Sequence, residues 1–148
     1  MLLRANRGPW TYYINTPTGF DKNKVGKWMV FFNAVTADHF VGICSAAVEF
    51  GTVKEAKHTQ VEIAERTNTG VACFYMNCDD MESHKKCIQM MQKLNLIRKT
   101  KTGKYYNISF KLDRQTEAGE YGDDYKGTIK LSDYIDLTTG EWLADKNS

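Results

Sequence analysis

Long apolar runs are missing from this 148-residue sequence. No stretch approaches the roughly 20 apolar residues that a membrane-spanning helix needs, so we expect no membrane span and no membrane partner. The N-terminal MLLRANRGPW breaks its apolar start at Arg4 and lacks the apolar middle of a secretion signal. We therefore expect a cytoplasmic protein.

Cysteine and histidine occur without the spacings of a disulfide framework or a metal site. The four cysteines, Cys44, Cys73, Cys78 and Cys87, form no CxxC pair, and each stands in an apolar context. Such cysteines are typically small, reduced core residues. The three histidines show neither an HxxxH nor a Cys-His spacing. The sequence therefore predicts free thiols, no metal and no cofactor.

A strong charge of one sign is also missing. The 20 basic residues are set against 18 acidic ones, which gives a formal charge of +2. A protein that coats a long polyanion carries a larger basic surplus, so we exclude long nucleic acid and expect any phosphate binding to be local. The length fits one domain, residues 1–148, with a single core. Whether the chain forms a homo-oligomer stays open.

Hydrophobic patterns predict alternating strands and helices. Apolar residues spaced by three and four favour amphipathic helices over 36–50 and 79–95. Runs of β-branched, aromatic and apolar residues separated by turn signals favour strands. The expected strands are 10–14, 27–32, 52–61, 70–77, 96–100, 104–113 and 127–135, with a turn at 65–70.

These elements predict an α+β fold of order ββαββαββ. Two helices cannot cover both faces of a sheet of six to seven strands, so we expect an antiparallel sheet with both helices on one face and the other face open. Within 104–113, Phe110 and Leu112 alternate to one side, while Lys111 and Asp113 alternate to the other. Lys111 is therefore expected on the open face.

Several segments resemble a known family in order and approximate spacing. They are KVGKWMVFF, GTVKEAKHT, VACFYMNCDDMESHKKCIQMMQKL and FKLDRQTEAGEY, between about Lys24 and Tyr121. They are similar to segments of the basophilic leukaemia-expressed protein family, a family of unknown function with a fold similar to that of cap-binding translation initiation factors. The resemblance implies the same fold here. Some members of that family are labelled phosphothreonine lyases.

The family motifs fall on definite residues of this chain. The G-K-W strand corresponds to Gly26, Lys27 and Trp28, and the A-K-x-S/T segment to residues 56–59. The Y-K-x-D-x-x-T-x-x-G-x-Y segment corresponds to residues 110–121. The sequence departs from the family in having phenylalanine at the first position of that segment, and in a 36–50 helix without the tryptophan expected after its first turns.

The residues themselves predict a phosphate subsite. Lys57 and Lys111 supply point charges on strands, while Arg114 and Thr116 add a forked donor and a hydroxyl at the start of the next loop. Asp113 would fix a lysine or accept a hydrogen bond from a ribose hydroxyl. The alternative interpretation is that these residues are solvated charges on an exposed sheet face.

Aromatic residues near these segments are candidates for stacking on a base. We retain Trp10, Trp28 and Tyr121, because a base stacked on an aromatic ring gains on the order of 1–3 kcal/mol. The alternative is that they belong to the core. His58 is adjacent to Lys57, and adjacent strand residues point to opposite faces, so we do not expect both in one site.

Three functions remain open at this stage. The first is non-catalytic binding of a phosphorylated nucleotide or nucleotide-derived signal, which fits a small viral protein that sequesters a host messenger in the host cytoplasm. The second is an enzyme acting on a phosphate ester, with Lys57 or Lys111 as base after a lowered pKa. The third is a protein–protein adaptor that uses the exposed sheet face.

Overall fold

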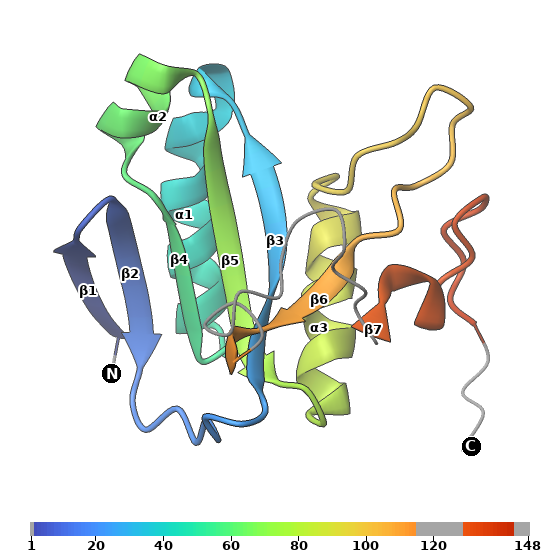
Figure 1. Ribbon diagram of the computed structural model, residues 1–148, viewed down its shortest axis with the longest axis horizontal. Helices are drawn as coiled ribbons and strands as arrows, with labels where there is room; N and C mark the ends of the chain where they lie inside the picture. The colour runs from blue at the N-terminus through green and yellow to red at the C-terminus, as the bar shows by residue number, and fades with distance from the viewer. Residues whose placement is uncertain (1, 115–128, 144–148) are drawn as a thin grey trace.

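Seven antiparallel strands form one open sheet in the computed structural model, which describes residues 2–114 and 129–143 (Figure 1). The strand order across the sheet is β1-β2-β4-β5-β3-β6-β7. The strands are β1 (Leu2–Arg7), β2 (Trp10–Asn15), β3 (Val25–Phe32), β4 (Glu55–Thr59), β5 (Gly70–Asn77), β6 (Ser109–Leu112) and β7 (Ile129–Lys130). The α+β prediction is confirmed.

Three helices accompany the sheet within the described residues: α1 (Ala37–Glu49), α2 (Val61–Thr67) and α3 (Met81–Lys93). Two short 3-10 turns, η1 (Ala34–Thr36) and η2 (Leu131–Asp133), complete the described elements. Figure 1 shows α1 and α3 on the same side of the sheet, with α2 at one end. The described helices are not long and apolar enough for any of them to cross a membrane.

The core lies between the sheet and the two longer helices. Strand β3 buries Trp28, Val30 and Phe32, while the opposite residues of β5 bury Phe74 and Ala72. Against this face α1 and α3 pack their own apolar stripes, formed by Phe40, Cys44, Ala47 and Val48 and by Cys87, Ile88 and Met91. Burial of the helix side alone explains the alternation along β3. The central strand β5 also buries Cys73 and Tyr75 on its other face.

A hydrogen-bonded pair ties the middle of the sheet to α3. The Trp28 indole Nε1 donates to Nδ1 of His84 at 2.9 Å, and both side chains are fully buried. An indole can only donate, so the other ring nitrogen of His84 carries the proton. That Nε2 donates to the carbonyl oxygen of Cys78 at 3.0 Å. His84 is therefore neutral and has one tautomer.

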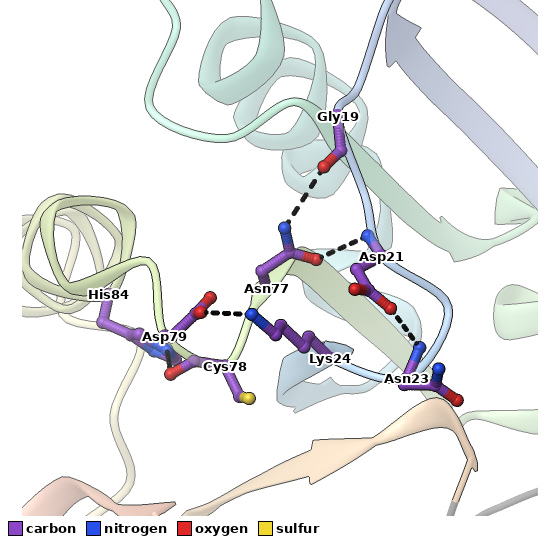
Figure 2. A network of polar contacts seen from close by, with 8 residues as sticks. All are labelled: Gly19, Asp21, Asn23, Lys24, Asn77, Cys78, Asp79 and His84. Atoms are coloured by element: carbon purple, nitrogen blue, oxygen red, sulfur yellow. Dashed lines mark hydrogen bonds and ion pairs between the residues drawn. The ribbon is translucent and has the colours of Figure 1, made fainter.

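Polar contacts hold the connection from β2 to β3 against the end of β5 (Figure 2). The Asn77 side chain accepts from the backbone N–H of Asp21 at 3.0 Å and donates to the carbonyl of Gly19 at 3.2 Å. Lys24 forms an ion pair with Asp79 at 2.8 Å, just before α3. These contacts fix where β3 begins.

Several predicted elements differ from the structure. Strand β1 and helix α2 were not predicted, and α2 begins where the expected strand 52–61 ends. Residues 96–100 and 104–108 lie outside the strands apart from an isolated bridge, Lys99 to Tyr105. The described part of 127–135 holds only the short β7 before η2. Sheet pairing, rather than local propensity, decides these segments.

The two buried histidines predict loss of stability in mild acid. Burial lowers the pKa of His84 and of His58 from the usual 6.5. As the pH falls below about 6.5, both histidines become protonated in the unfolded chain but stay neutral in the folded chain. The free energy of unfolding should therefore fall by up to about 1.4 kcal/mol per pH unit for each histidine, until the lowered folded pKa is reached.

Denaturant titrations between pH 7.5 and pH 5 measure this slope. His84→Gln should be less stable than the wild type at pH 7.5 but should show a shallower pH dependence. His39→Gln, at an exposed position of α1, is the matched control and should keep the wild-type slope. An unchanged slope in His84→Gln would contradict the linkage.

Thiol reactivity provides a second check of the core. All four cysteines are free, and Cys44, Cys73 and Cys87 are buried while Cys78 is partly exposed. We expect a thiol reagent to modify Cys78 first in the native protein and all four after denaturation without prior reduction. Fewer than four equivalents in denaturant would contradict the free-thiol state.

Candidate functional site

The candidate site lies on the face of the sheet that faces away from the helices. Directly opposed residues of antiparallel strands place their side chains on the same face. One row across this face comprises Tyr12, Lys57, Cys73 and Met29, and the neighbouring row comprises Ile14, Glu55, Tyr75, Lys27 and Lys111. Strand pairing therefore gathers three lysines from β3, β4 and β6 on one surface.

Lys57 lies among aromatic rings. Its Nζ is 3.9 Å from the centroid of the Trp10 ring, 5.5 Å from that of Tyr12 and 5.7 Å from that of Tyr75. The ring faces attract the ammonium, while burial removes part of its water. Burial lowers the pKa of Lys57, and the nearby Lys27 ammonium acts in the same direction.

A second lysine is held by an ion pair. Lys27 Nζ contacts Asp113 Oδ1 at 2.7 Å, and the two side chains are 12% and 31% exposed. Lys111 is the cross-strand neighbour of Lys27. Burial lowers the pKa of Lys111, and the Lys27 charge lowers it further. Asp113 is thus the carboxylate that fixes a lysine, and that lysine is Lys27.

Glu55 completes the charged cluster. Burial raises the pKa of its carboxyl, and the Asp113 charge raises it further. Within this cluster the three lysines Lys27, Lys57 and Lys111 outnumber the two acidic side chains. The surface therefore favours a ligand that carries negative charge next to a flat apolar part.

The structure brings together part of the predicted site. Lys57, Lys111, Asp113 and Trp10 share the open face, and Arg114 is exposed directly after Asp113. Thr116 and Tyr121 lie outside the described residues.

Trp28 does not belong to this surface. Its side chain is fully buried on the helix-covered face, where its N–H bonds to His84, so no base can stack on it. The reason is alternation: Lys27 and Trp28 are neighbours on β3 and point to opposite faces.

Four members of the cluster were not among the predicted site residues: Tyr12, Lys27, Glu55 and Tyr75. Tyr12 is opposite Lys57, Lys27 is opposite Lys111, and Glu55 is two residues from Lys57. Tyr75 is opposite Glu55 and Lys27, so it adjoins no predicted residue directly. A period-two pattern could have placed Lys27 opposite the apolar Trp28, Val30 and Phe32. The cross-strand neighbours could not be predicted in this way, because the sequence of one strand does not determine its register with the next.

His58 lies on the other face from Lys57, as expected. It is fully buried, and its Nδ1 contacts the carbonyl of Thr59 at 2.7 Å while its Nε2 contacts the Tyr13 hydroxyl at 3.0 Å. A backbone carbonyl can only accept, so Nδ1 donates and Nε2 accepts from the hydroxyl. His58 is therefore a core residue with satisfied hydrogen bonds.

Comparison of the chain with protein-family models and with curated proteins finds no match to either. The resemblance to the basophilic leukaemia-expressed protein family stays a prediction.

The packing of Lys57 on Trp10 predicts a specific signal in NMR spectra. At 3.9 Å from the ring centroid, the ε-methylene protons of Lys57 should be shifted upfield by the indole ring current. Trp10→Leu should remove the shift and Tyr12→Leu should leave most of it. Lys54, exposed just before β4, is the reference lysine. An ordinary chemical shift for the Lys57 ε-methylene protons in the wild type would contradict the packing of Lys57 on Trp10.

Proposed function

We propose that the open face binds a phosphorylated nucleotide or a nucleotide-derived signal and does not convert it. The observation that carries this proposal is the position of Lys57, caged by three aromatic rings and close enough to Lys27 for their charges to interact. Such a site offers a cation and a flat apolar surface side by side, which are the two things that a nucleotide requires.

The lysines favour a phosphate ligand for an electrostatic reason. Burial removes water from Lys57 and Lys111, and the Lys27 charge repels both. An anion bound between them would offset the lost hydration and reduce the repulsion. Hydrogen bonds between ammonium groups and phosphate oxygens are among the strong ones. The lysines stand on strands rather than loops, which limits the conformational entropy that their side chains lose on binding.

The aromatic side chains favour a base beside the phosphate. Trp10 and Tyr12 are half-buried on β2, so neither residue is closed off from solvent. Glu55 and Asp113 are near enough to accept hydrogen bonds from a ribose hydroxyl or a base N–H group. Binding without conversion would let the protein act by sequestration, as a viral sponge protein does on a host messenger in the host cytoplasm.

An enzyme acting on a phosphate ester is the second candidate. The observation in its favour is the lowered pKa of Lys57, since a lysine needs such a shift to serve as a base at neutral pH. An elimination also needs a proton donor. His58 cannot supply it from the opposite, buried face, which favours binding over catalysis.

Alanine variants of two lysines test the phosphate subsite. Lys57→Ala and Lys111→Ala should each weaken nucleotide binding by roughly 1.5–3 kcal/mol, the range for a hydrogen bond to a charged group. The double variant should deviate from the sum of the singles, because residues that share one ligand couple. Calorimetry against mono-, di- and cyclic nucleotides and ADP-ribose-type compounds measures the affinities, which should fall with added salt.

Lys54→Ala is the matched control for these variants. Lys54 is exposed just before β4, and its removal should leave binding unchanged. Equal binding of every ligand by the wild type and both single variants would contradict the subsite. Mass spectrometry of the bound ligand decides between the two candidates, because a dephosphorylated or unsaturated product requires the enzyme.

A further inference from the structure

One edge of β3 carries backbone groups that no neighbouring strand uses. The N–H of Cys78 donates to the carbonyl of Lys24 at 2.8 Å, which continues the register between β3 and β5 by one pair. Hydrogen-bonded pairs alternate along an antiparallel ladder. The even-numbered residues of β3 therefore bond to β5, and the odd-numbered ones direct their N–H and C=O groups toward β6.

Strand β6 uses only the first part of this edge. It pairs with β3 at Gly26 and Lys27, and its other residues pair with β7. Beyond Lys27, the N–H and C=O groups of Met29 and Phe31 point toward the same edge. Among the described residues, the ladder with β6 has no pair at Met29 or Phe31, and no backbone hydrogen bond from outside the strands reaches them. Four strand-forming groups are thus presented in a row.

A cavity lies along this stretch of the edge. It has a volume of about 300 Å³ and is lined on one side by Met29, Val30 and Phe31. Two segments form the other side, 96–98 and 106–108. We call this cavity the β3 edge groove. Its floor is apolar, and at its mouth Phe31 and Tyr106 are 58% and 50% exposed.

Arg98 gives the β3 edge groove a charge. It is exposed and lines both the groove and a second hollow of about 420 Å³ that continues past Phe31 along Asn33 and Asn68. Arg98 forms no ion pair within the described residues. A guanidinium placed between the two hollows is a ready partner for a carboxylate.

We propose that the β3 edge groove binds an extended acidic peptide segment of a partner protein, which adds a strand to β3. Two alternate residues of the peptide would bond to Met29 and Phe31, and an acidic side chain would meet Arg98. This is the usual chemistry of strand addition at a sheet edge, in which backbone bonds give affinity and side-chain contacts give selectivity. The groove lies beside the nucleotide surface, so this proposal goes beyond the proposed function and does not rest on it.

The other sheet edge argues against a second copy of this chain as the occupant. Strand β1 is the free edge strand at that end, and it carries Arg4 and Arg7. Inserted beside Arg98, it would bring like charges together. The peptide must also end or turn near Lys27, because Lys111 already pairs there. A short acidic strand that enters from the Phe31 end satisfies both conditions.

Synthetic peptides test the charge preference. The probe is a fluorescein-labelled pentapeptide of alternating valine and glutamate with blocked ends, and its partner has lysine in place of glutamate. The acidic peptide should bind the wild-type protein at least tenfold more tightly by fluorescence anisotropy. Arg98→Glu should invert this preference, while Lys22→Glu, at an exposed position in the 16–24 connection, should preserve it.

Backbone hydrogen exchange tests the strand addition itself. In the free protein, the amides of Met29 and Phe31 should exchange much faster than those of Trp28 and Val30, which bond to β5. Saturating acidic peptide should slow exchange at Met29 and Phe31 at least tenfold and leave the other two unchanged. N-methylation of the peptide residues whose N–H groups bond to β3 should abolish binding. N-methylation of the alternate residues, whose N–H groups point away from β3, should leave binding intact.

Three outcomes would overturn the proposal. They are equal binding of the acidic and basic peptides, an unchanged preference in Arg98→Glu, or peptide binding without protection of Met29 and Phe31. Absence of binding by either peptide would overturn it as well, because neither depends on a particular partner sequence. The alanine variants at Lys57 and Lys111 should bind the peptide normally. Failure of the nucleotide proposal can therefore be distinguished from failure of the peptide proposal.

Discussion

The register between β3 and β5 is the constraint on which the rest of the structure depends. All eight residues of β3 pair with β5, in the middle of the sheet. Side chains alternate with period two, so a slip of one residue would turn Trp28 out to solvent and carry Lys27 into the core. A buried ammonium without a partner costs several kcal/mol, and the lost indole packing adds to that. The correct register is therefore strongly favoured, and the open face with its lysines follows from it.

Local patterns were enough to predict the parts of the fold that depend on one segment at a time. Helices α1 and α3 lie where their apolar spacing placed them, and both pack on one face as expected. In β6, Phe110 and Leu112 are buried and Lys111 is on the other face, as alternation predicted. Strand β5, almost unbroken in apolar residues, is central, and its residues 72–76 are buried on both faces. In each case the buried positions follow a pattern that can be seen within a few residues.

The rest depends on contacts between distant segments, which no local pattern contains. Lys27 and Asp113 are 86 residues apart in sequence yet form the ion pair of the candidate site. The hydrogen-bond partner of the buried Trp28 is His84, 56 residues further along the chain. Residues 96–100 and 104–108 have strand-like composition, yet they form almost no pairs because β6 leaves β3 after Lys27. Register and strand order supply this information, and they emerge only when the whole sheet is assembled.

One small residue determines how β6 meets β3, and through it both proposed surfaces. A Cβ at Gly26 would lie 2.5 Å from the carbonyl oxygen of Lys111 and 2.6 Å from the ring of Phe110, so only glycine allows this close crossing. The crossing brings Lys111 beside Lys27 and allows Asp113 to reach it, which completes the charged cluster. It also turns β6 toward β7, so that the edge of β3 beyond Lys27 faces a cavity instead of a strand. A larger residue at Gly26 would displace β6 and disturb both surfaces together, although they share no charged residue. The nucleotide surface depends on what β6 contributes, and the β3 edge groove depends on what β6 leaves unpaired.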